Sequence, residues 1–262
     1  MTSKNLSKKS NIIEPNVNNN KEEPSIPGTK TNPGVRGLTR KHIDQRLRVL
    51  YNRAAVLEEQ LLKLDDNRFY RACIFGSARI KPESKAYEEV RSLAKMLSHV
   101  GIDILTGGGP GLMEAANLGA KEGSVTGGTK SLSIGLSIQL EWEPEANKHL
   151  DIKRHHQRFS SRLDDFMRLS HAFIVTPGGI GTVLELFFTW QLIQVKHMPV
   201  KPIILMGRDF WEPLMKWMRE VPLQRGLVSP SDFECMVIVD TPEEAFTAVR
   251  KDYDRVKKLL LK

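Results

Sequence analysis

The 262-residue chain has few cysteines, no long apolar segment and no apolar stretch at its N-terminus. Cys73 and Cys235 are its two cysteines, and both lie inside apolar runs, as buried thiols of a reducing compartment do. A disulfide framework and a cysteine-rich metal cluster are therefore not expected. No segment reaches the ~18–20 apolar residues that cross a bilayer, and the start M-T-S-K-N-L-S-K-K-S lacks the core of a secretory signal. We expect a cytoplasmic protein without a membrane partner.

Basic residues outnumber acidic residues, which gives a formal net charge of +8 and a pI of about 9.4. Such an excess can indicate a nucleic-acid partner. However, the basic residues are scattered along the chain, and no basic stripe is interleaved with aromatic residues. A generally basic surface explains the charge best, and a small anionic ligand explains it as well as a polymer would.

The composition changes along the chain and divides it into three parts. Residues 1–38 are rich in Asn, Lys, Ser and Pro, which predicts a disordered N-terminal tail. Residues 39–66 carry apolar side chains at helical spacing, among them Ile43, Leu47 and Leu50, which predicts an amphipathic helical extension. Residues 67–262 are expected to form a single domain.

Short apolar runs alternate with glycine turns and helical patterns throughout this third part. The pattern predicts an α/β fold with a doubly wound parallel sheet, flanked by helices and joined by right-handed crossovers. Ligands bind beyond the carboxyl ends of the strands in such sheets. The expected strands are 72–75, 102–105, 132–138, 172–175, 202–206 and 236–239, and the expected helices are 84–99, 112–122, 157–169, 211–219 and one from 242.

Glycine clusters follow three of the expected strands. A single glycine turn after a strand is common, but three at equivalent positions favour a phosphate-bearing ligand. Glycine lets the ligand approach the backbone, and a helix start offers unpaired N–H groups. The candidate phosphate-binding residues are Gly76, Ser77, Gly108, Gly109, Gly111, Pro177, Gly178, Gly179, Gly181 and Thr182.

The clusters do not match the common nucleotide-binding motifs. G-G-G-P-G-L departs from the dinucleotide pattern G-x-G-x-x-G, and residues 123–130 reverse the final pair of G-x-x-x-x-G-K-[ST]. Neither NAD nor ATP is supported, so a mononucleotide or a sugar phosphate remains.

Glu185 follows the third cluster and admits two interpretations. Residues 182–185 match a capping box. In this motif the side chains of Thr182 and Glu185 accept hydrogen bonds from backbone N–H groups in the first turn of the helix. Alternatively, a carboxylate one sugar away from a bound phosphate could stabilise an oxocarbenium-like transition state or position a water.

Basic residues precede this cluster at helical spacing. Arg154, Arg158 and Arg162 would form either a solvated face or an arginine site that grips a carboxylate or phosphate. His155 and His156 point apart if they lie on a helix, and no further ligand has suitable spacing, so we predict no metal site.

Residues 177–185 match the pattern P-G-G-x-G-T-x-x-E without exception. This nonapeptide resembles the LOG (Lonely Guy) family, often described as possible lysine decarboxylases, and the resemblance extends over about residues 71–206. It implies that residues 67–262 form a Rossmann-like nucleotide-binding domain that assembles as a homodimer or a higher homo-oligomer. The implied reaction is hydrolysis of the N-glycosidic bond of nucleoside 5'-monophosphates, without a cofactor. AMP or cytokinin riboside monophosphates would be the substrates, in an AMP-nucleosidase-like reaction. The resemblance assigns the catalytic pair to Glu185 and Arg162.

One departure from the family pattern leaves an alternative open. The family's arginine commonly precedes a lysine, whereas Arg162 precedes Leu163. A non-catalytic carrier or sensor of a nucleotide or of the molybdenum cofactor is therefore the second hypothesis, and nucleic-acid binding the third. Nothing in the sequence marks a pyridoxal-binding lysine, so decarboxylation is not supported.

Overall fold

The computed structural model describes residues 43, 45–51, 70–138 and 146–260. The chain divides into two compact units, Met1–Ala54 and Ala55–Lys262. In the first unit, residues 45–51 are helical. The predicted tail lies outside the described residues, and the predicted extension is described only in part. No helix in the described part of the chain combines the length and apolar character needed to cross a membrane.

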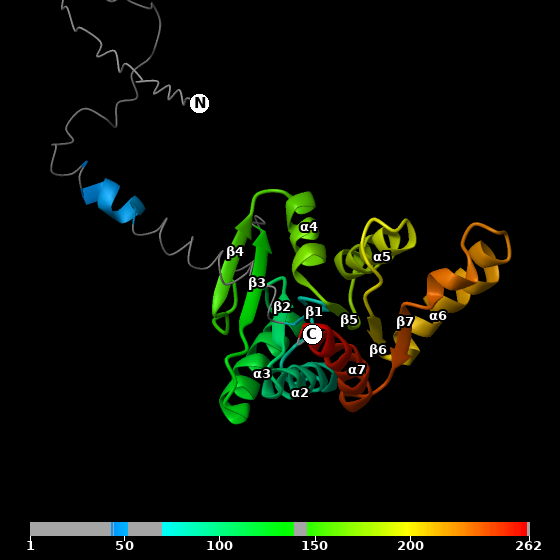
Figure 1. Cartoon of the computed structure of the whole chain (residues 1–262), viewed down its shortest axis with the longest axis horizontal. Helices are drawn as coiled ribbons and strands as arrows, with labels where there is room; N and C mark the ends of the chain where they lie inside the picture. The colour runs from blue at the N-terminus through cyan, green and yellow to red at the C-terminus, as the bar shows by residue number, and fades with distance from the viewer. Residues whose placement is uncertain (1–42, 44, 52–69, 139–145, 261–262) are drawn as a thin grey trace, which may run out of the picture. The chain divides into compact units, whose positions relative to one another are not determined.

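The second unit is built on a seven-stranded parallel sheet with the order β4-β3-β2-β1-β5-β6-β7 (Figure 1). This architecture confirms the predicted fold class. The chain builds the sheet outward from β1 to β4 and then returns to the other side of β1 with β5, so the order reverses between β1 and β5. The strands are β1 Arg71–Phe75, β2 Asp103–Thr106, β3 Ser133–Ile138, β4 Ile152–His156, β5 Ala172–Val175, β6 Ile203–Met206 and β7 Met236–Val239.

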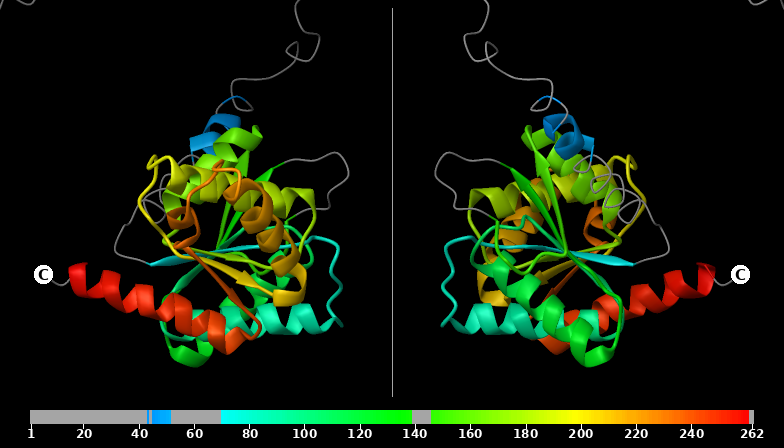
Figure 2. Two further views of the ribbon diagram at one scale, coloured as in Figure 1. Left: turned by 90° about the vertical axis from the view of Figure 1, so that its right-hand side faces the viewer. Right: turned by 90° about the vertical axis from the view of Figure 1, so that its left-hand side faces the viewer.

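Helices cover both faces of the sheet (Figures 1 and 2). One core contains side chains of α2 Lys85–His99, α3 Leu112–Gly127 and α7 Pro242–Leu260, and the other contains side chains of α4 Phe159–Leu169, α5 Ile180–Gln194 and α6 Arg208–Met218. Strand β1 contributes side chains to both cores, because successive side chains of a strand point to opposite faces of the sheet. Ala72 and Ile74 lie in the first core, and Cys73 and Phe75 lie in the second. The short helical turns Arg219–Leu223 and Pro230–Phe233 follow α6.

The edge strand β4 was not predicted, because its sequence I-K-R-H-H reads as part of a polar connection. Charged residues on an edge strand are a common protection against pairing with other chains. The strand pairs with β3 through its backbone, and Lys153 and His155 are exposed. The predicted helical series of arginines is therefore wrong. Arg154 belongs to this strand, and Arg158 is the N-cap residue of α4.

Lys201 fixes the C-terminal end of α4. Its ammonium group donates hydrogen bonds to the carbonyl oxygens of Met167, at 2.8 Å, and Ser170, at 2.6 Å. The last carbonyls of a helix lack partners within the helix, and a cation there also complements the helix dipole. Burial lowers the pKa of Lys201 to about 8, so the group remains mainly charged at pH 7. The lysine therefore holds the helix that carries Arg162 against the start of β6.

We predict that Lys201→Met lowers the free energy of unfolding by about 2 kcal/mol at pH 7, because two charge-assisted hydrogen bonds are lost while the aliphatic stem is kept. Urea denaturation measures the change. Lys216→Met is the matched control, since Lys216 is exposed and its Nζ lies 3.8 Å from Glu220. This control should change stability by less than about 0.5 kcal/mol. Equal effects of the two variants would contradict the capping role.

Candidate functional site

The carboxyl ends of β1 and β5 meet where the strand order reverses. The Ser77 N–H donates to the Pro177 carbonyl at 3.3 Å. The Thr176 hydroxyl donates to the Phe75 carbonyl at 2.8 Å, and a Cβ on Gly76 would lie 2.3 Å from that hydroxyl oxygen. Two of the predicted glycine clusters are therefore directly joined at the position where such sheets bind ligands.

The remaining cluster, residues 107–111, reaches the same place from the end of β2. The Leu112 N–H donates to the Ser77 carbonyl at 3.0 Å. Gly111 has φ +68°, and a Cβ there would lie 2.4 Å from the Ser77 oxygen, so this position requires glycine. The structure thus brings all three predicted clusters together at the reversal point of the sheet.

Helix α5 begins inside the third cluster and offers its N-terminus to this place. Gly179 is the N-cap residue, without a side-chain cap, and Gly179 and Gly181 are exposed. A Cβ on Gly178 would lie 2.2 Å from the Thr182 hydroxyl oxygen, so that buried hydroxyl lies directly beside the loop. The first N–H groups of the helix have no partners within it and suit an anion.

The predicted capping box is wrong, because α5 starts before Thr182. Thr182 lies in the first turn of the helix, and Glu185 lies in the second turn. The sequence signal for the box was misleading because the glycine at position 179 already provides the helix start. Glu185 is therefore available for another role.

Arg162 projects from α4 toward the glycine loop after β2. Its Nε donates to the Leu136 carbonyl at 2.8 Å, and its guanidinium carbon lies 5.3 Å from the centroid of the Phe166 ring. A Cβ on Gly107 would lie 2.3 Å from Nη2 of Arg162, so the guanidinium is packed against the Gly107 backbone. Gly107 therefore leaves room for the arginine, a role that differs from the predicted phosphate contacts of its neighbours.

Glu185 is half-buried and lies within the electrostatic influence of Arg162. Burial raises the pKa of Glu185 to about 7, and the positive charge of Arg162 opposes this increase. The pKa of the Cys73 thiol is affected by both groups. Burial raises this pKa most, the charge of Glu185 raises it further, and the charge of Arg162 lowers it. A carboxyl group with a pKa near neutrality that is influenced by the charge of an arginine is typical of a catalytic site.

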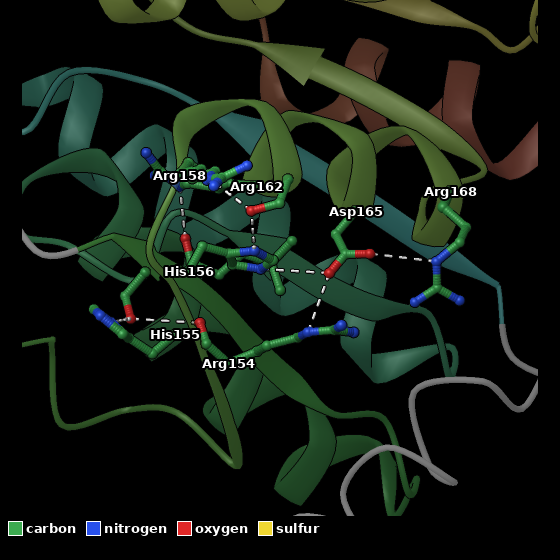
Figure 3. Close-up of polar contacts among 10 residues, drawn as sticks. Arg154, His155, His156, Arg158, Arg162, Asp165 and Arg168 are labelled. Atoms are coloured by element: carbon green, nitrogen blue, oxygen red, sulfur yellow. Dashed lines mark hydrogen bonds and ion pairs between the residues drawn. The ribbon is translucent and has the colours of Figure 1, made fainter. Parts of the chain in front are cut away.

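Asp165 connects α4 to the edge strand β4 (Figure 3). Its Oδ2 lies 3.1 Å from Nε of Arg154 and 3.4 Å from Nε2 of His156, and its Oδ1 lies 3.3 Å from Nε of Arg168. The Asp165 side chain is only 12% exposed, so its ion pair with Arg154 is screened less than a pair on the surface. The cluster fixes α4 one turn beyond Arg162. Arg154 thus has a structural partner, and sequence reasoning missed Asp165.

The two neighbouring histidines have different partners (Figure 3). Nδ1 of His155 lies 3.4 Å from the Ser137 hydroxyl, and Nδ1 of His156 lies 3.3 Å from the Ser161 hydroxyl. Burial lowers the pKa of His156, although Asp165 opposes this effect. Among the described residues, no group of three or more His, Cys, Asp or Glu side chains is arranged to hold a metal ion.

Comparison with known proteins identifies the family. The model of the family described as "Possible lysine decarboxylase" matches residues 113–249, and the chain belongs to this family. The rice (Oryza sativa subsp. japonica) protein "Probable cytokinin riboside 5'-monophosphate phosphoribohydrolase LOGL2" is 31% identical over 186 residues, covering 68% of this chain and 71% of the rice protein. A second rice protein, LOGL3, is 29% identical over 194 residues, covering 72% and 87%. The predicted family is thus confirmed.

Solved structures show the same fold. The molybdenum cofactor carrier protein of Chlamydomonas reinhardtii superposes with a TM-score of 0.53 at 20% identity, over 71% of this chain and 99% of the carrier. The molybdenum cofactor binding protein of Rippkaea orientalis gives a TM-score of 0.52 at 20% identity, over 71% and 98%. At this level of identity the similarity concerns the fold alone.

The raised pKa of Glu185 leads to a prediction about stability. Because the folded-state pKa, about 7, exceeds the ordinary 4.5, folding favours the protonated carboxyl. That stability is complete below about pH 4.5 and is lost as the pH rises through 7. Glu185→Gln should therefore unfold with a free energy about 1–3 kcal/mol above that of the wild type at pH 8, and the gain should be smaller at pH 5.

Urea denaturation of both proteins at pH 5 and pH 8 measures this difference. Glu234→Gln, at an exposed carboxylate, is the control and should show no such dependence. A Glu185→Gln effect that is the same at the two pH values would show that Glu185 does not titrate near neutrality.

Proposed function

We propose that the protein hydrolyses the N-glycosidic bond of nucleoside 5'-monophosphates, releasing a free base and ribose 5-phosphate. The observation that carries the proposal is the position of Glu185. It is a half-buried carboxyl group with a pKa of about 7, near Arg162, one turn inside a helix that starts at a glycine-rich anion site. The family membership and the names of the rice relatives support the same reaction. AMP and cytokinin riboside monophosphates are the proposed substrates.

In the proposed mechanism the α5 N-terminus and the Thr182 hydroxyl bind the phosphate, together with the backbone of residues 107–111. Glu185, as a carboxylate, stabilises the positive charge that develops on the ribose as the bond to the base breaks. A water molecule forms the new bond to the same carbon, and the proton that it loses balances the proton taken up by the departing base. Arg162 orients the substrate and favours the ionised form of Glu185. The residues themselves supply these steps, without a cofactor.

The test is a panel of nucleoside 5'-monophosphates with chromatographic detection of the free base. We expect Glu185→Gln to lower kcat by at least about 100-fold, since the variant removes the charge and keeps the shape. Arg162→Ala should also lower base release, and Glu234→Gln should retain it. Base release by Glu185→Gln at the wild-type rate would show that the assignment of this residue is wrong.

A carrier or sensor role is the second candidate, and Leu163 is the observation that favours it. The residue after Arg162 is aliphatic here, whereas the family resemblance leads us to expect a lysine. A carrier would use the same phosphate site without hydrolysis. The panel separates the two functions, because saturable nucleotide binding without any base release would favour the carrier.

We also propose that the protein works as a cytoplasmic homodimer. Two apolar side chains on one side of α5 support a protein interface: Ile180 is 91% exposed and Leu184 is 49% exposed. These residues are four positions apart and are therefore neighbours on the helix surface. We predict that Leu184→Asp yields a monomer in sedimentation equilibrium while the wild type is a dimer, because the aspartate would place a charge in the interface. A monomeric wild type would contradict the proposal.

A further inference from the structure

A buried chain of hydrogen bonds lies behind the glycine loop that follows β2. The Thr106 hydroxyl donates to Oδ1 of Asn117 at 2.8 Å, and Nδ2 of Asn117 donates to the Ser133 hydroxyl at 2.9 Å. Nδ2 of Asn147 donates to the same Asn117 Oδ1 at 2.9 Å. Thr106, Asn117 and Ser133 are almost fully buried and come from β2, α3 and β3. Sequence reasoning assigned no role to these residues.

The same network holds the backbone of the loop. The Gly108 N–H donates to the Thr106 hydroxyl oxygen at 2.9 Å. The Gly108 carbonyl accepts from the Asn147 N–H at 2.9 Å, and the Gly109 carbonyl accepts from Nδ2 of Asn147 at 3.0 Å. Gly108 has φ +72°, and a Cβ there would lie 3.3 Å from Cα of Gly135. The loop is therefore fixed by side chains from behind while its backbone runs close to β3.

These bonds determine the direction of one free donor. The C=O and N–H groups of a trans peptide point in opposite directions. The Gly108 carbonyl points to Asn147, so the N–H of Gly109 points to the opposite side. The next peptide offers no N–H, because Pro110 follows Gly109. Gly109 therefore provides the N–H whose direction the network sets.

We propose that Thr106, Asn117 and Asn147 are positioning residues that aim the Gly109 N–H at the phosphate of the substrate. This inference rests on the proposed function, in which residues 107–111 bind that phosphate. Buried networks of this kind are rigid when every member is satisfied. A fixed donor avoids reorganisation when the anion binds, so the network contributes to phosphate affinity more than to bond cleavage.

Thr106 offers a matched pair of variants for the test. Thr106→Val keeps the shape but removes the acceptor of Gly108 N–H and the donor to Asn117, whereas Thr106→Ser keeps both. We expect Thr106→Val to raise KM for a nucleoside monophosphate and Kd for ribose 5-phosphate about tenfold, with kcat changed by less than about threefold. Thr106→Ser should restore both constants to near the wild-type values. Asn147→Asp should resemble Thr106→Val, because it removes the donor to the Gly109 carbonyl.

Two further measurements separate this role from general damage and from failure of the proposed function. The rate for a nucleoside without a phosphate should be the same in Thr106→Val and the wild type, and an equal loss with nucleoside and nucleotide would overturn the proposal. Calorimetric binding of ribose 5-phosphate needs no catalysis. If the wild type binds it but cleaves no nucleotide, the proposed hydrolysis fails and the comparison of the variants still decides this inference. Absence of binding to the wild type, or equal binding by Thr106→Val, would overturn it.

Discussion

The site depends on how the Arg162 guanidinium is held. This group is bonded through Nε to the Leu136 carbonyl, packed near the Phe166 ring and placed against the backbone of Gly107. A free arginine side chain has many rotamers, and ordering it costs conformational entropy. Here the side chain is already ordered in the folded protein by contacts with β3, α4 and the loop after β2. A preorganised cation can then act on Glu185 without further rearrangement.

Helix α4, which carries this arginine, is held at two points in its C-terminal half. Asp165 binds α4 to β4 through Arg154 and His156, and Lys201 caps the last turn of the same helix. The edge strand β4 thus helps to fix the helix that carries Arg162. Arg154 in this basic segment therefore has a structural role through Asp165.

Much of the fold could be predicted because it follows from local patterns. The apolar runs and glycine turns indicated the strands that surround β1, and the nonapeptide at residues 177–185 indicated the family. Strand β4 was missed since its exposed side chains are charged and its pairing with β3 uses backbone groups that any sequence has. The buried network of Thr106 and Asn117 could not be predicted either. It joins residues from three elements, and each of them is an ordinary polar residue in the sequence.

In the proposed mechanism, helix α5 binds a phosphate at its N-terminus and carries the catalytic carboxyl group of Glu185 one turn further in. The helix dipole favours an anion at the N-terminus, but a carboxylate one turn further in would repel a bound phosphate. Burial reduces this conflict, because with a pKa of about 7 the carboxyl group is partly neutral near physiological pH. The positive charge of Arg162 opposes this effect, because it lowers the pKa of Glu185 and favours the carboxylate form. In the proposed mechanism, the balance between burial and this arginine therefore sets whether the site favours binding the phosphate or stabilising a cation on the ribose.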